Sequence, residues 1–104
     1  MTRQEAARKV VDECFWGDYV LSESEVLTRL DAGDPDFARF LFGKIADNAS
    51  YPSRLIRLLF DDSTIREILD ATAAQPRWAD LHHRLIRANL TGRPDLVPER
   101  QWKP

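Results

Sequence analysis

Few residues of this chain have both the type and the spacing that chemistry requires. The two histidines, His82 and His83, are adjacent. Neighbouring residues of a helix point about 100° apart, so these two cannot bind one metal ion from the same face. A helical pair of metal ligands would need a spacing of three or four residues. Because His82 lies beside Leu81 and Leu85, we predict a partly buried, hydrogen-bonded side chain there, not a ligand or a catalytic base.

The remaining reactive side chains also have structural explanations. Cys14 falls on an apolar stripe near the expected end of a helix, where burial makes a thiol unreactive. The acidic pairs Asp34 with Asp36 and Asp61 with Asp62 fall at helix boundaries, where carboxylates cap helices and interact favourably with the helix dipole. The chain has four glycines and no phosphate-binding loop. We therefore predict no catalytic, metal-binding or cofactor-binding residue, and no enzymatic activity.

Two pairs of arginines have the spacing that places both members on one face of a helix. Arg54 and Arg57 form one pair, and Arg84 and Arg87 form the other. If the two faces are adjacent, they make a basic patch that could hold phosphate or carboxylate. The alternative is that these arginines are solvated and form ion pairs with nearby acidic residues.

Aromatic residues are concentrated in the segment Phe15-Trp16-Gly17-Asp18-Tyr19. One interpretation is a hydrophobic anchor that closes the first helix on the core. In the other, Trp16 or Tyr19 is exposed and contributes to a protein interface, where aromatic residues often dominate the binding energy. Trp102, near the C-terminal end, raises the same two alternatives.

Composition indicates a single globular domain. The 104 residues are 43% hydrophobic and 31% charged, with a formal net charge of −2. Residues 1–50 contain six Lys and Arg against ten Asp and Glu, whereas residues 51–104 contain nine against seven. The overall balance gives no general attraction to nucleic acid or to a membrane. One cysteine and the lack of a long apolar segment favour a cytoplasmic protein that does not associate with membranes.

The hydrophobic pattern has a helical period throughout and predicts an all-α fold. We expect a compact bundle of five or six short helices as domain 1–92, followed by an extended, proline-containing tail over 93–104. Helices are expected over 4–16, from Ser22 to Gly33, after Asp34-Pro35, from Pro52 to Asp61, over about 64–73 and from Pro76 to Gly92, with the fourth in the centre. Ser22 with Glu25 and Thr64 with Glu67 have capping-box spacing.

The same pattern predicts which residues face the core. The third helix should bury Phe37, Phe40, Leu41 and Ile45, with Phe42 covered from another side. In the last two helices, the residues expected to face inward are Ile65, Ile68, Leu69, Ala73, Trp78, Leu81, Leu85 and Ala88.

Residues 15–60 resemble a group of small bacterial proteins encoded beside nucleotidyltransferase-like toxins of abortive-infection systems. The likeness is the order of three features: the cluster Phe-Trp-x-Asp-Tyr, a short acidic amphipathic helix, and the segment Phe37-Ala-Arg-Phe-Leu-Phe-Gly-Lys-Ile45. The chain departs from that pattern at Gly17, where an Asp is common, and at Asp47-Asn48, where a basic turn is usual. The resemblance implies a cognate protein partner and an antitoxin-like role, and it transfers no catalytic residue.

The sequence thus predicts a non-catalytic interaction or regulatory protein that binds a protein partner. The partner-binding candidates are Trp16, Tyr19, Arg54, Arg57 and Trp102, and the possible basic patch adds Arg84 and Arg87. The alternative is a helical module that binds nucleic acid through its paired arginines.

Overall fold

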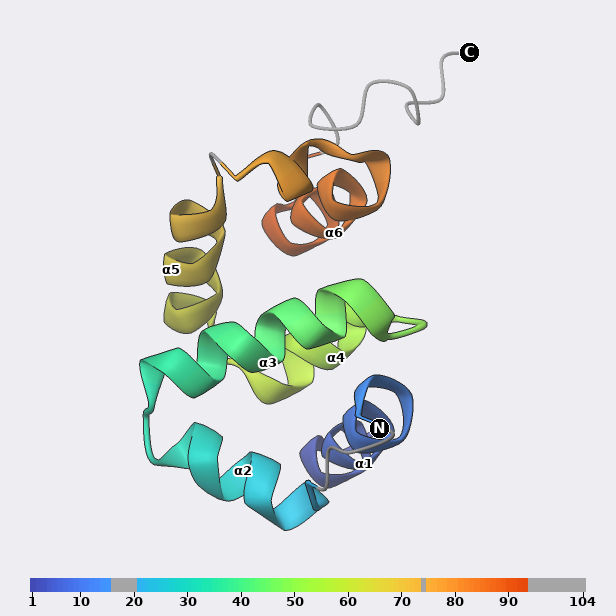
Figure 1. Ribbon diagram of the computed structural model, residues 1–104, viewed down its shortest axis with the longest axis vertical. Coiled ribbons are helices and arrows are strands. Elements are labelled where there is room, and N and C mark those ends of the chain that lie inside the picture. Colours follow the sequence, from blue (N-terminus) through green and yellow to red (C-terminus); the bar gives the residue numbers. More distant parts are fainter. Residues whose placement is uncertain (16–20, 74, 94–104) are drawn as a thin grey trace.

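A computed structural model describes residues 1–15, 21–73 and 75–93. Over these residues the chain is all-α and contains no strand (Figure 1). The helices are α1 (Arg3–Cys14), α2 (Glu23–Asp31), α3 (Pro35–Asn48), α4 (Pro52–Leu59), α5 (Asp62–Thr72), a 3-10 turn η1 (Pro76–Ala79) and α6 (Leu81–Thr91). The predicted all-α bundle of five or six helices is confirmed, whereas the tail from residue 94 onward lies outside the described residues.

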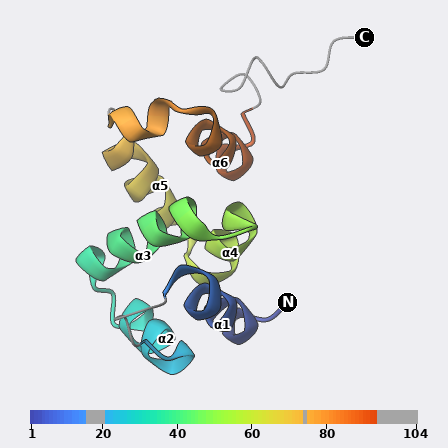
Figure 2. The ribbon, with the colours of Figure 1, turned by 45° about the vertical axis from the view of Figure 1, so that its right-hand side comes forward.

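Helix α4 lies in the centre of the arrangement, as the apolar run from Leu55 to Phe60 predicts. It packs against α1, α3 and α6, and it links the N-terminal helices to the C-terminal ones (Figure 2). Leu55, Ile56 and Leu59 are buried, and the polar residues that remain on α4 stay at the surface. An eight-residue helix is too short to be stable alone, so its stability comes from this packing.

Side-chain caps begin most of the helices. Ser22 Oγ accepts a hydrogen bond from the backbone N–H of Glu25, which is one half of the predicted capping box. Asp34 caps α3 directly before Pro35, as predicted. The predicted box at Thr64 is wrong, whereas the expectation that one of the paired aspartates at this boundary caps a helix is confirmed. Asp61 caps α5 by accepting from the Thr64 N–H at 2.8 Å, so this helix begins two residues earlier. An aspartate already in the extended conformation can serve as the N-cap, and Thr64 then lies inside the first turn.

Helix α3 is covered on more than one side, as predicted. Phe37, Leu41 and Ile45 are buried, but Phe40 is 38% exposed and that part of the prediction is wrong. Phe42 is buried, which confirms that a second side of α3 is covered. The ring centroid of Phe42 lies 5.7 Å from that of Phe60 and 6.0 Å from that of Trp78.

The C-terminal segment also differs from expectation. Instead of one helix from Pro76, η1 is followed by α6, because Asp80 is extended and caps α6 at the His83 N–H.

Trp78 and Ala88 are buried as predicted, while Leu81 and Leu85 are half-buried. Ala73 is exposed, contrary to prediction, because it lies past the last helical residue of α5. Gly92 ends α6 with a φ of 70°, a left-handed conformation that suits glycine.

Candidate protein-interaction surface

The structure describes four of the seven predicted site residues. Trp16, Tyr19 and Trp102 lie outside the described residues. Arg54 and Arg57 are exposed on α4, whereas Arg84 and Arg87 are half-buried on α6.

Arg57 joins α4 to the end of α6. Its guanidinium donates a hydrogen bond to the backbone carbonyl of Asn89. The last carbonyls of a helix have no partner within the helix, so an arginine there satisfies an acceptor and interacts favourably with the negative end of the dipole. Arg57 therefore stabilises the packing of α4 against α6.

Arg87 makes a similar contact at the end of another helix. Its Nη2 atom donates to the carbonyl of Leu69 at 2.7 Å and to Thr72 Oγ1 at 3.3 Å, both near the C-terminal end of α5. Its guanidinium also lies 5.6 Å from the centre of the Trp78 ring, within the range of a cation–π interaction. Burial lowers the pKa of Arg87, and the charge of Asp70 opposes that shift.

Arg57 and Arg87, one from each pair, therefore face different neighbours. Arg57 contacts the end of α6, while Arg87 turns towards the end of α5. The guanidinium groups of Arg57 and Arg87 are each used in joining one helix to another. Arg54 is placed differently, since it lines a surface groove between α4 and α6.

This groove, which we call the Tyr51 groove, has a volume of about 350 Å³. Tyr51, Pro52, Leu85 and Ile86 supply its apolar lining, and Arg54, His82 and other polar residues complete it. Tyr51 is 70% exposed, the largest exposure among the large hydrophobic side chains that the structure describes.

Sequence reasoning missed Tyr51, although a signal was present. It directly precedes Pro52, and proline disfavours the helical conformation for the residue before it. Tyr51 has a φ of −129° and a ψ of 67° and lies just outside the first turn of α4. It therefore lies outside the buried stripe of α4, which Leu55, Ile56 and Leu59 form.

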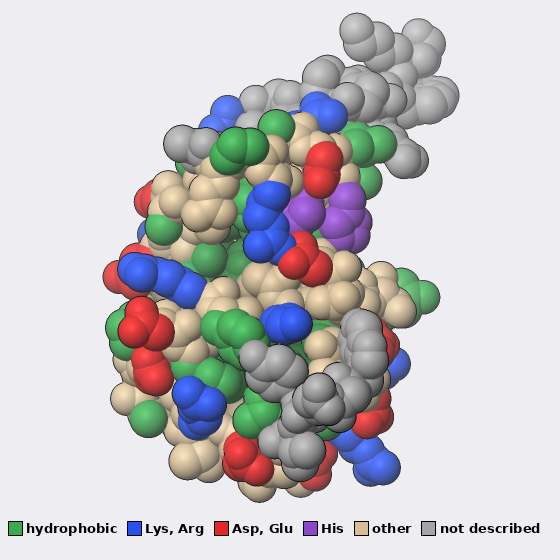
Figure 3. Space-filling view, in the orientation of Figure 1, with side chains coloured by type: hydrophobic (Ala, Val, Ile, Leu, Met, Phe, Trp, Pro, Cys, Tyr) green, Lys and Arg blue, Asp and Glu red, His purple; other side chains and the backbone are tan. Residues whose placement is uncertain are grey.

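A polar cluster beside the groove joins the C-terminal segment to the end of α3. His83 Nδ1 lies 2.7 Å from Asp80 Oδ1, and His83 Nε2 lies 3.0 Å from Asp47 Oδ1. Arg77 also forms an ion pair with Asp47. Figure 3 shows histidine side chains between acidic and basic ones at this junction.

The hydrogen-bond donors of this cluster stabilise the ionised forms of its two carboxylates. Burial disfavours the charged form of Asp47, but hydrogen bonds from Arg77 and His83 outweigh this and lower its pKa. The backbone and side chain of His83 likewise lower the pKa of Asp80. Each ring nitrogen of His83 thus lies within hydrogen-bond distance of a different carboxylate, so one buried ring joins Asp80 to Asp47.

The prediction that His82 is the partly buried histidine is wrong. His83 is only 7% exposed and its ring centroid lies 5.0 Å from that of Trp78, whereas His82 is exposed. The His82 ring still has a hydrogen bond, because its Nε2 atom lies 2.6 Å from the carbonyl oxygen of Ala46. A carbonyl only accepts, so Nε2 carries the proton in this contact.

The fold places this chain among small all-α proteins, and its described surface offers grooves between helices. Within the described residues, no group of three or more histidine, cysteine or acidic side chains is arranged to hold a metal ion. None of the described helices is both long enough and apolar enough to cross a membrane. In comparisons with known proteins, no family model, curated protein or solved structure matches the chain.

Proposed function

We propose that this chain is a non-catalytic interaction or regulatory protein that acts by binding a protein partner. The observation that supports this proposal is the Tyr51 groove, where an exposed aromatic ring stands beside an apolar lining and an exposed guanidinium. Tyrosine and arginine are enriched among residues that contribute most to protein–protein binding. The groove includes Arg54, one of the partner-binding candidates that the sequence indicates.

The chemistry of the groove suggests what it would contact. Arg54 and His82 favour a carboxylate, while Tyr51, Leu85 and Ile86 favour an apolar side chain. A partner segment that carries an acidic residue near a hydrophobic one would satisfy both parts. The resemblance of residues 15–60 to antitoxin-like proteins makes a nucleotidyltransferase-like toxin the first partner to test.

The contacts that Arg57 and Arg87 make within the protein weaken the alternative of a nucleic-acid-binding module. Arg57 and Arg87 donate to backbone carbonyls of neighbouring helices, so these donors are already engaged. A phosphate backbone would have to compete with those bonds. We therefore propose a protein, and not a nucleic acid, as the partner.

A pull-down with the tagged protein and three variants tests this proposal. Tyr51→Ala and Arg54→Ala should each weaken capture of a stoichiometric protein partner, whereas Arg8→Ala, on the exposed side of α1, should not. Because Tyr51 is largely exposed, Tyr51→Ala should leave the melting temperature nearly unchanged.

Two results would count against the proposal. One is equal capture by the wild type and by both groove variants, which would exclude the Tyr51 groove as the contact. The other is recovery of nucleic acid alone, released by salt, which would favour the arginines as a phosphate-binding surface.

A further inference from the structure

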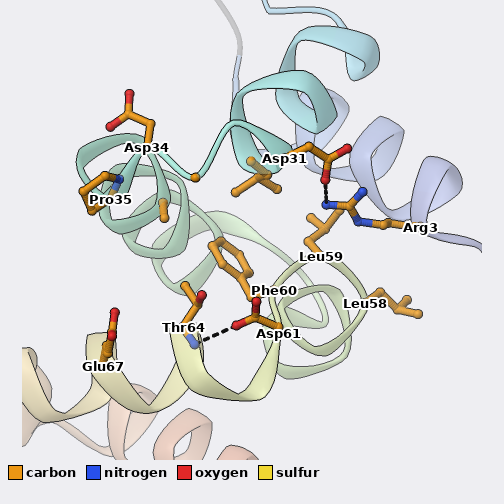
Figure 4. Close-up of a pocket in the computed structure, with 13 residues that line it drawn as sticks. Arg3, Asp31, Asp34, Pro35, Leu58, Leu59, Phe60, Asp61, Thr64 and Glu67 are labelled. Carbon is orange, nitrogen blue, oxygen red and sulfur yellow. Dashed lines mark hydrogen bonds and ion pairs between the residues drawn. The ribbon is translucent and has the colours of Figure 1, made fainter.

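A second groove lies at the other end of α4, where the ends of five helices meet (Figure 4). Its lining includes Leu58 and Leu59 from the end of α4, whereas the Tyr51 groove is built on Pro52 and Ser53 at the start. The volume is about 600 Å³, which is within the range of sites that bind ligands. We call it the Leu58 groove.

The floor of the Leu58 groove is apolar. Leu58, Leu59 and Phe60 come from the last turn of α4 and the residue after it, while Leu30 and Ala38 come from α2 and α3. Leu30 and Leu58 are only partly buried, so part of this apolar surface is open to solvent. In Figure 4 the Phe60 ring lies between Asp34 and Glu67 on one side and Asp31 with Arg3 on the other.

The rim of the groove is acidic. Asp31, Asp34, Asp61 and Glu67 line it, against the single guanidinium of Arg3. Arg3 is paired with Asp31, with Nη2 2.8 Å from Oδ1, so its charge is already balanced. The lining therefore has an excess of three negative charges when all of these groups are ionised.

Among these carboxylates, Glu67 is the one best placed to meet a partner. Asp34 and Asp61 accept hydrogen bonds from the first amides of α3 and α5, which offset part of their charge. Glu67 lies more than one turn inside α5 and is exposed. In Figure 4 its side chain extends from α5 towards the groove.

We propose that the Leu58 groove binds a basic amphipathic segment of a protein partner. Apolar side chains of that segment would lie on Leu30 and Leu58, and its Lys or Arg side chains would meet the carboxylates of the rim. Amphipathic segments commonly bind in grooves between helices, and complementary charge determines which segments are accepted. This surface is separate from the Tyr51 groove, so the two proposals can fail independently.

Three labelled peptides of equal length test the proposal by fluorescence anisotropy. The first has leucines on one helical face and lysines on the other. The second has serine in place of leucine, and the third has glutamate in place of lysine. We expect saturable binding of the first peptide alone, weakened by added salt, because both the floor and the rim contribute.

Two charge reversals locate the binding site. Glu67→Lys should weaken binding of the first peptide by about tenfold or more. Asp12→Lys makes the same charge change on the exposed face of α1, outside the groove, and should change binding much less. Circular dichroism checks that both variants remain helical.

Amide chemical shifts of the wild-type protein give a second readout that needs no variant. The first peptide should shift the amides of Leu30, Leu58 and Glu67 more than those of Tyr51 and Arg54. The proposal is overturned by equal binding of the serine peptide, by equal effects of the two reversals, or by the absence of binding at low salt. Shifts confined to the Tyr51 groove would also overturn it.

Discussion

The Nε2 atom of His83 lies 3.0 Å from Oδ1 of Asp47, and this contact joins a buried imidazole on α6 to the carboxylate near the end of α3. Arg77 pairs with the same carboxylate, and His82 donates to the carbonyl of Ala46 one residue earlier. Cationic and donor groups of the C-terminal segment thus meet the end of α3, where the helix dipole is negative. These contacts position α6 and, with it, one side of the Tyr51 groove.

Asp47→Ala should destabilise the protein by about 1–3 kcal/mol, because it removes the carboxylate that the buried ring of His83 shares with the exposed Arg77. Urea unfolding measures the change, and Asp12→Ala is the control, since Asp12 is an exposed acidic residue on α1. A double-mutant cycle with His83→Phe isolates the pair. Additive effects of the two changes would show that the contact contributes nothing.

Gly43→Ala should stabilise the protein by up to about 1 kcal/mol, because glycine inside a helix is less favourable than alanine. A Cβ atom at this position would have Arg77 Nη1 as its nearest neighbour, at 4.0 Å, so there is room for a methyl group. Gly92→Ala is the matched control and should destabilise, since Gly92 has a φ of 70°. Destabilisation by both changes would contradict the open environment of Gly43.

Cys14 should react very slowly with thiol reagents in the folded protein. Burial, with a smaller contribution from Glu13, raises the pKa of its thiol to about 11. At pH 8 the thiolate is then about 0.1% of the total, against roughly a quarter for an ordinary cysteine. Ellman's reagent measures the rate, which should rise with pH and increase sharply in urea. Fast reaction in native buffer would show that the thiol is exposed.

Asp61 should contribute stability that is lost in acid. Hydrogen bonds from the side chain and backbone of Thr64, and from Ser63, lower the pKa of this carboxylate. Its contribution is therefore present above the unfolded-state pKa of about 3.9 and decreases as the pH falls through the lower folded value. Asp61→Asn keeps a capping acceptor but does not titrate. The melting temperature of the wild type should exceed that of the variant by a larger margin at pH 6 than at pH 3. An equal margin at both pH values would contradict a stabilising role of the ionised Asp61 carboxylate.

The sequence by itself determined the class of the fold and most helix boundaries, because these depend on local interactions. A helical period of apolar residues, the cap at Asp34 and the prolines at 35 and 52 act within a few residues of chain. The central place of α4 also followed from composition, since a helix with so little polar surface has to be covered on several sides.

Only the tertiary structure decided which side chains are covered and which meet. Phe42 and Phe40 are two residues apart on α3, and the packing of Phe60 and Trp78 determines that Phe42 is the buried one. His83 is buried because its ring packs against Trp78 and reaches Asp47, whereas His82 contacts the carbonyl of Ala46 and stays exposed. Both candidate grooves likewise combine residues from helices that are distant in sequence, and no local pattern specifies how such helices approach one another.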